Sequence, residues 1–282
     1  MHSQNISAEP VVTGSNTLRT RSGVTLFYRS WGAGQPVVFL HSWGFSSLMW
    51  TYQMTYLGER GMHCIAYDRR GHGRSDQPAH GYDMDTLADD LADVLEGFDL
   101  HDVVLVGHSM GGAEILRYVG RHGTSRIAKV VLLAPVTPFV LQTPDNPNGI
   151  PATVLEQARA PWSVDFPKWI EDSKPPFFMP DTSPQMMNWL ALEMQRLPLP
   201  IAIACNKTLV ETDLRPDLSK VDRPTLVLHG DADASAPLEI TSKPTADGIK
   251  DAILKIYPSA PHALFVTHMD HVNRDIEGFV NG

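Results

Sequence analysis

The stretch Val106-Gly107-His108-Ser109-Met110-Gly111-Gly112 decides the fold of this chain. An apolar run, residues 103–105, precedes it, and apolar side chains at helical spacing follow it at Ile115, Leu116 and Val119. The sequence therefore predicts a strand, a sharp turn between glycines and then a helix. In that setting a G-x-S-x-G pentapeptide marks a nucleophilic serine at the turn.

Ser109 is the candidate nucleophile because of what this turn does to its side chain. We expect a backbone conformation that few residues adopt, with the hydroxyl held at the N-terminus of the helix. There, free N–H groups and the helix dipole favour developing negative charge. Gly107 and Gly111 are expected because a Cβ atom at either position would collide across the tight turn.

His262 is the best candidate for the base that Ser109 needs, since a serine hydroxyl is a poor nucleophile by itself. Of the 12 histidines, it is the one that follows the strand-like run 253–256 and the turn 257–261 and precedes a C-terminal helix. It is therefore expected at the carboxyl end of the last strand, on the same rim as Ser109.

The acid that orients this base is expected between the serine and the histidine in the chain. The run Leu226-Val227-Leu228-His229-Gly230-Asp231-Ala232-Asp233 ends in two carboxylates at a strand end. Asp233 is favoured because it lies further along the loop, toward the rim. Asp231 is expected to cap the turn through nearby backbone N–H groups. Asp233 would hold the tautomer of His262 and stabilise the imidazolium.

Two backbone donors are needed to hold an oxyanion. One is the N–H of Met110, directly after the nucleophile. The other is assigned to Trp43, in the loop His41-Ser42-Trp43-Gly44 that follows the strand-like run 37–40. The side chains expected to line the substrate pocket are Ser42, Phe45, Val136, Ser235 and Leu264.

Short apolar runs alternate with helical patterns along most of the chain. Strands alternating with helices predict an α/β fold with a mostly parallel, eight-stranded sheet and helices on both faces. Each motif above falls at the carboxyl end of a strand, where ligands bind in such sheets. The expected strands are an edge hairpin, 18–20 with 24–31, and the runs 37–40, 63–67, 103–106, 130–133, 225–228 and 253–256.

One helix is expected from apolar side chains that recur between residues 87 and 98. The acidic residues Asp89, Asp90, Asp93 and Glu96 lie between them. The pattern predicts an amphipathic helix with an acidic outer face.

The alternation stops between residues 135 and 212, a stretch rich in proline and large apolar side chains. We interpret it as a helical cap inserted between the sixth and seventh core strands. Its aromatic and methionine side chains are equally typical of an apolar substrate pocket and of the core of a small cap. The expected divisions are a loose N-terminal arm, 1–16, the core, 17–134, the cap, 135–212, and the rest of the core, 213–282.

The amino-acid composition argues against several classes of binding partner. With 23 basic and 32 acidic residues, the net charge is −9, which argues against nucleic acid or anionic lipid. No run of about 18 apolar residues predicts a membrane span, and the N-terminus shows no signal-peptide pattern. Cys64 and Cys205 have no metal-site spacing and are expected to be reduced core thiols, which favours the cytoplasm. We expect a small-molecule substrate and no metal; a homo-oligomer is left open.

Together these residues resemble the α/β-hydrolase superfamily, and within it the cofactor-free bacterial haloperoxidase and aryl esterase (perhydrolase) group. The resemblance implies Ser109, Asp233 and His262 as the catalytic triad. It also implies ester hydrolysis without metal or haem, with halogenation as a by-product of peracid formation. The similarity runs from about residue 18 to residue 279 and is carried by Phe39-Leu40-His41-Ser42-Trp43, Tyr67-Asp68-Arg69-Arg70-Gly71-His72-Gly73-Arg74-Ser75, Ser109-Met110-Gly111-Gly112-Ala113-Glu114, Thr143-Pro144-Asp145-Asn146-Pro147, His229-Gly230-Asp231-Ala232-Asp233, Ala260-Pro261-His262, Thr267-His268 and Asn273.

The chain departs from the pattern of that group at three places. Ser42 stands where the group usually has glycine. Gly44 stands where perhydrolases of the group often have proline, which argues against strong perhydrolysis. The small residues Ala234-Ser235-Ala236 stand where bulky β-branched ones are usual, which predicts that bulkier esters are accepted.

Two other kinds of function stay open from the residues alone. The same triad can hydrolyse lactones, amides or carbon–carbon bonds. A receptor with very slow turnover on the same scaffold is the alternative outside catalysis. Epoxide hydrolysis and dehalogenation are disfavoured, because the relatives that perform them have aspartate where Ser109 stands.

Overall fold

A nine-stranded sheet forms the centre of the molecule in the computed structural model, which describes residues 9–14 and 16–282. The order of the strands is β1-β2-β3-β5-β4-β6-β7-β8-β9. Their bounds are β1 Val11–Val12, β2 Thr17–Arg19, β3 Thr25–Trp31, β4 Gln35–Leu40, β5 Met62–Tyr67, β6 Val103–His108, β7 Ile127–Leu133, β8 Thr225–Gly230 and β9 Ile253–Tyr257.

The ninth strand is the one that the sequence did not predict. Strand β1 is only two residues long and pairs antiparallel with β2, through Val11 opposite Arg19. Part of the arm expected over residues 1–16 therefore belongs to the sheet edge, because two β-branched residues supply a short ladder. Residues 1–8 and 15 of that arm lie outside the described residues.

The strands from β4 to β9 run parallel, while β3 lies antiparallel beside β5. Alternate residues of each central strand enter two separate cores. In β4, Val37 and Phe39 face one core and Val38 and Leu40 face the other, and all four are buried. A strand buried on both faces reads as an unbroken apolar run, which explains why the sequence predicted these strands well.

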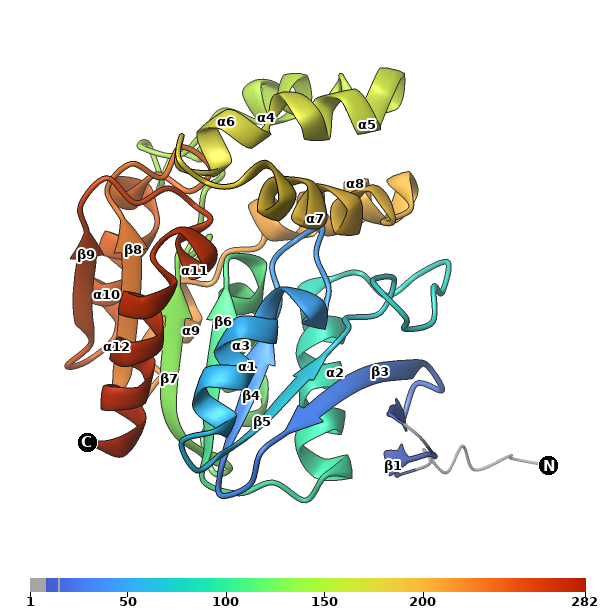
Figure 1. The fold of residues 1–282 in the computed structure, drawn as a ribbon. Helices are drawn as coiled ribbons and strands as arrows, with labels where there is room; N and C mark the ends of the chain where they lie inside the picture. The colour runs from blue at the N-terminus through green and yellow to red at the C-terminus, as the bar shows by residue number, and fades with distance from the viewer. Residues whose placement is uncertain (1–8, 15) are drawn as a thin grey trace.

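Helices cover both faces of the sheet (Figure 1). Helix α1, Thr51–Gly58, packs against α12, Met269–Asn281, on one face. Helix α2, Met84–Gly97, packs against α3, Met110–His122, on the other face. Shorter helices complete the core: η1 Ser47–Trp50, α9 Arg215–Leu218, η2 Leu238–Ile240, α10 Ser242–Gly248 and α11 Leu264–Thr267.

Helix α2 begins at Asp83, whose side chain accepts a hydrogen bond from the backbone N–H of Thr86. Its predicted acidic outer face is wrong in part, since Asp90 and Asp93 are buried. Two arginines from other segments pair with them: Arg70 Nε lies 2.6 Å from Asp90 Oδ2, and Arg21 Nη1 lies 2.6 Å from Asp93 Oδ1. A buried carboxylate is tolerated when such a partner satisfies it, and no helical periodicity reveals that partner.

Five of the helices that follow β7 lie within residues 135–212, the segment predicted as a cap. Figure 1 shows them gathered at one end of the sheet, beyond the carboxyl ends of the central strands. A loop with two isolated β-bridges leads into them from Ala134. The helices are α4 Ala152–Arg159, α5 Trp162–Asp172, α6 Lys174–Phe177, α7 Pro184–Gln195 and α8 Leu199–Glu211.

Both cysteines, Cys64 in β5 and Cys205 in α8, are buried free thiols, as predicted. Burial raises the pKa of each thiol to about 12. Among the described residues, no helix combines the length and the apolar character that crossing a membrane requires.

Candidate active site

Ser109 sits alone between β6, which ends at His108, and α3, which begins at Met110. Its backbone has φ 56° and ψ −114°, a conformation that costs a non-glycine residue about 1–3 kcal/mol. Gly107 makes the turn possible, since a Cβ there would lie 2.6 Å from the carbonyl carbon of Gly111. The strained turn expected from the pentapeptide is therefore present.

Gly111 also lets the turn approach strand β4 closely. A Cβ atom at Gly111 would lie 2.3 Å from the carbonyl oxygen of Leu40, at the end of that strand. Strand β4 pairs directly with β6, with Leu40 opposite Gly107. The turn at Ser109 and the loop after β4 are consequently pressed against each other.

Asp233 and His262 meet at the same rim. The Nδ1 atom of His262 lies 2.7 Å from Oδ2 of Asp233, and both side chains are buried. The other carboxylate oxygen of Asp233 accepts the backbone N–H groups of Ser235 and Ala236, each at 2.8 Å. Burial by itself would raise the pKa of Asp233, but the charge and hydrogen bond of His262 and the bond from Ala236 outweigh it, and the pKa lies below its ordinary value.

This contact also fixes the tautomer of His262. A carboxylate can only accept, so Nδ1 of His262 carries the hydrogen and Nε2 is left as an acceptor. Asp231 lies elsewhere: it is exposed, and its Oδ1 accepts the backbone N–H of Ser259 at 2.6 Å. The two carboxylates of this loop thus have the separate surroundings that the sequence predicted.

His229 was missed by the sequence argument. Its Nε2 donates to the carbonyl oxygen of Ala236 at 2.8 Å and lies 3.3 Å from Oδ2 of Asp233, and its Nδ1 lies 2.6 Å from the hydroxyl of Ser242. Burial lowers the pKa of His229, which keeps the ring neutral. The ring therefore braces the loop that carries Asp233.

His108, inside the pentapeptide, contacts both the backbone and the ring of His262. Its Nε2 donates to the backbone carbonyl of His262 at 2.9 Å, and the two rings lie 4.7 Å apart between centroids. Burial lowers the pKa of His108 well below its ordinary value, so this ring is also neutral. His108 and His229 each belong to a motif that the sequence showed, and this was the signal that could have identified them. Their hydrogen-bond partners lie in other segments of the chain.

Trp43 and Met110 are the predicted oxyanion donors. Trp43 follows β4, and Met110 is the first residue of α3, where a backbone N–H has no acceptor within the helix. Throughout residues 9–14 and 16–282, no hydrogen bond is formed by either of these two N–H groups. Both are thus unused in the structure.

A buried ion pair, which the sequence did not predict, holds the loop that contains Trp43. Arg69 Nε lies 2.5 Å from Oε1 of Glu114, and both side chains are 1% exposed. The Nη2 atom of Arg69 donates to the carbonyl oxygen of His41 at 2.7 Å, and its backbone N–H donates to Nε2 of the same histidine at 2.9 Å. Burial, helped by the nearby Arg69 charge, lowers the pKa of His41 well below its ordinary value.

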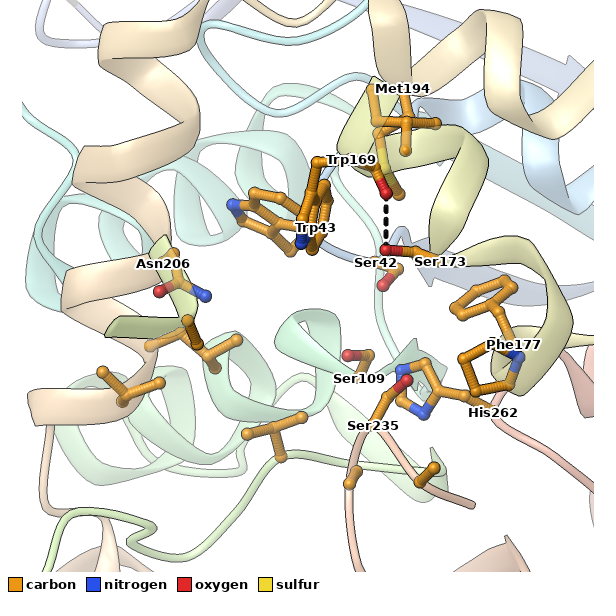
Figure 2. A pocket seen from close by; sticks show the side chains of 18 of the residues that line it. Ser42, Trp43, Ser109, Trp169, Ser173, Phe177, Met194, Asn206, Ser235 and His262 are labelled. Atoms are coloured by element: carbon orange, nitrogen blue, oxygen red, sulfur yellow. Dashed lines mark hydrogen bonds between the residues drawn. The ribbon is translucent and has the colours of Figure 1, made fainter. Parts of the chain in front are cut away.

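A cavity of about 430 Å³ opens over these groups (Figure 2). Ser109 and His262 lie next to each other on its wall, with Ser42 close by. No hydrogen bond joins the side chains of Ser109 and His262 in the part of the chain that the structure describes, and such bonds commonly tighten only when substrate binds. The predicted pocket residues that line the cavity are Ser42, Phe45, Val136 and Ser235.

Leu264 does not line the cavity, and its predicted role in binding is wrong. It is fully buried among the apolar residues of the core on the α12 side. Two residues beyond His262, the chain has already turned into α11, and the first side chain of that helix packs inward.

Side chains from the five inserted helices close the cavity opposite Ser109. The indole of Trp43 stacks on that of Trp162 with 4.9 Å between centroids, and its Nε1 donates to the carbonyl of Ala202 at 2.9 Å. Trp169 and Phe177 line the cavity, whereas Phe166 packs into the core. The large apolar residues of this segment therefore serve both as pocket wall and as core.

Among the described residues, no three side chains of His, Cys, Asp or Glu come together in a way that would hold a metal ion.

The comparisons with known proteins agree with this geometry. Residues 35–269 match the family described as alpha/beta hydrolase fold. The chain belongs to the α/β-hydrolase family. It is 39% identical to a non-heme chloroperoxidase of Kitasatospora aureofaciens over 93% of this hydrolase and 98% of that protein. It is 35% identical to a bifunctional esterase/perhydrolase of Acinetobacter calcoaceticus, again over 93% and 98%.

A solved structure of a related protein has the same fold as this hydrolase. The bromoperoxidase of Bacillus anthracis superposes with a TM-score of 0.88 at 34% identity, over 92% of this chain and 96% of that one. The expected α/β-hydrolase fold and the resemblance to the haloperoxidase and esterase group are both confirmed. The chain is an enzyme of the α/β-hydrolase type whose relatives include an esterase.

Proposed function

We propose that this hydrolase cleaves carboxylic esters through an acyl-enzyme formed on Ser109, with His262 as base and Asp233 as orienting acid. The observation that carries the proposal is the shared cavity wall of Ser109 and His262, with His262 hydrogen-bonded to a buried, ionised Asp233. A relative described as a bifunctional esterase/perhydrolase supports esters as the substrate class and perhydrolysis as a side activity.

The chemistry proceeds in two halves. Nε2 of His262 takes the hydroxyl proton while Oγ of Ser109 attacks the ester carbonyl carbon, and the backbone N–H groups of Trp43 and Met110 hold the resulting oxyanion. Collapse breaks the bond to the alcohol, which leaves with the proton from His262. Water then attacks the acyl-enzyme, gives its proton to His262, and the acid is released as Ser109 regains its proton.

The inserted segment is proposed as the cap that shapes the acyl or alcohol side of the pocket. Ala234, Ser235, Ala236 and Pro237 line the cavity beside His262, and all four side chains are small or short. The resulting room supports the prediction that bulky and branched esters are accepted.

Steady-state kinetics with a panel of p-nitrophenyl esters test the function. We expect many turnovers per enzyme with acetate and with longer and branched acyl groups, and no turnover above background in Ser109→Ala. Ser125→Ala is the matched control, because Ser125 is exposed and precedes the amino end of β7, at the opposite edge of the sheet from the rim. A single burst with no further turnover would instead support the slow receptor, and activity retained in Ser109→Ala would refute the nucleophile.

A further inference from the structure

The cavity carries positive charge in a protein whose net charge is −9. Two cationic side chains, Arg159 and Lys174, line it, and no aspartate or glutamate among the described residues does so. Most of the remaining wall is apolar. Such a surface favours a ligand that carries negative charge on an otherwise apolar body.

Lys174 is already neutralised by its neighbours. Its Nζ atom lies 2.5 Å from Oε2 of Glu171 and 2.7 Å from Oδ1 of Asn188. The lysine therefore contributes little unmatched charge to the cavity.

Arg159 is different, because no carboxylate neutralises it. It is the last residue of α4 and is partly buried, and its Nη1 donates to Oδ1 of Asn206 on α8 at 3.1 Å. Among the described residues, no carboxylate oxygen lies within 4.0 Å of its guanidinium. A partly buried cation beside apolar side chains is stabilised when an anion joins it.

Asn206 supplies a second donor at the same place. A guanidinium can only donate, so the amide oxygen of Asn206 faces Arg159 and the amide nitrogen is left to donate elsewhere. Figure 2 shows that nitrogen directed toward the middle of the cavity, with Asn206 on the opposite side from His262 and Ser109 between them. Asn206 and the pair Ser109 and His262 thus lie on two sides of a cavity whose remaining lining is mostly apolar.

We propose that Arg159 and Asn206 bind a carboxylate at the far end of the substrate, so that the preferred substrates are half-esters of dicarboxylic acids. Arg159 presents a planar fork that matches the two oxygens of a carboxylate, and Asn206 adds one donor. The apolar middle of the cavity would hold the methylene chain between carboxylate and ester. This inference rests on the ester hydrolysis proposed above.

A matched pair of substrates tests it. Monomethyl adipate and methyl hexanoate have the same ester group and the same chain, and differ in ending with a carboxylate or a methyl group. In Arg159→Met we expect kcat/KM for the half-ester to fall about 10- to 100-fold, mostly through KM, because a charge-assisted contact is lost. Methyl hexanoate should stay within about twofold. Arg196→Met is the control, since Arg196 is 74% exposed and does not line the cavity.

Binding to Ser109→Ala separates this inference from the proposed function. Tryptophan fluorescence reports on the cavity because Trp43, Trp162 and Trp169 line it. We expect monomethyl adipate to bind more tightly than methyl hexanoate, and the difference to vanish in Ser109→Ala/Arg159→Met. Equal binding of the two esters, or equal losses of kcat/KM for both in Arg159→Met, would overturn the carboxylate site. Selective binding without hydrolysis by the wild type would overturn only the esterase proposal.

Discussion

Asp231 and Asp233 show how strongly position decides the role of a single residue. They are the same amino acid, two positions apart, in one loop after β8. Asp231 is exposed and holds a turn through the N–H of Ser259, whereas Asp233 is buried against His262. The low pKa of Asp233 keeps it ionised there, so it can stabilise a positive charge on the imidazole.

The residue-scale prediction compares the two carboxylates. In Asp233→Asn we expect kcat to fall about 10³- to 10⁴-fold, because a neutral amide no longer stabilises the imidazolium or enforces its tautomer. Asp231→Asn keeps an oxygen for the N–H of Ser259 and should stay within about twofold. Initial rates on a p-nitrophenyl ester, with circular dichroism to check folding, give the comparison. Equal effects of the two substitutions would contradict the assignment of the acid.

The loop after β4 is the element on which the site depends most. It is pressed against the turn of Ser109 through Leu40 and Gly111, and Arg69 holds it through two contacts to His41. Within it, Gly44 has φ +83°, which L-residues rarely adopt. Proline is fixed near φ −65°, so the proline that perhydrolases of the group often have here is incompatible with this backbone.

The element-scale prediction concerns stability at two glycines. Gly44→Ala should lower the free energy of unfolding by about 1–2 kcal/mol, because its positive φ disfavours a Cβ atom. Gly278→Ala, inside α12 with nothing within 4 Å of the added Cβ, should raise it by about 0.5–1 kcal/mol. Urea unfolding followed by circular dichroism measures both. A Gly44→Ala variant as stable as the wild type would show that the loop relaxes to another backbone.

Across the whole molecule, several histidines are buried and neutral. His41, His72, His108 and His229 are all buried, and burial lowers the pKa of each. In His72, burial and the nearby Arg69 lower the pKa to about 3. Each ring is buried, so protonation would place a charge in the core, where it is poorly solvated.

These histidines predict that the folded state loses stability in mild acid. The unfolded chain takes up their protons below about pH 6.5 and the folded chain does not, so their contribution is complete above that pH and falls as pH decreases toward 3. Each histidine that is protonated in the unfolded chain and neutral in the folded chain lowers the free energy of unfolding by about 1.4 kcal/mol for each pH unit of acidification. Buried carboxyls such as Asp90, whose pKa burial raises to about 6, oppose the trend and reduce the total slope.

Unfolding free energies measured between pH 5 and pH 8 check this prediction. The wild type should be most stable near neutral pH, and His72→Gln should show a shallower decline below pH 6.5. His101→Gln is the control, because the His101 side chain is 61% exposed. A decline as steep in His72→Gln as in the wild type would show that His72 is not a source of the pH dependence.

The sequence by itself determined the central sheet, the strained serine turn and the rim on which the proposed base and acid lie. Short unbroken apolar runs bounded by turn residues indicate strands buried on both faces, and parallel strands place the residues that follow them at one edge. These features depend on residues that are close together in the chain, so the sequence alone is enough to predict them. The same logic separated Asp233 from Asp231, since two residues are enough to move a side chain from a turn to the rim.

Only the tertiary structure decided which polar groups meet across distant segments. The pairs of Asp90 with Arg70 and of Arg69 with Glu114 leave no periodic signal, so the predicted acidic face of α2 was wrong in part. Leu264 turned inward because α11 begins there, and β1 joined the sheet because an edge was open to it. The shape and charge of the cavity, with both Arg159 and Ser109 on its wall, arise where the inserted helices meet the sheet. Packing between such distant segments is not encoded at any one place in the chain.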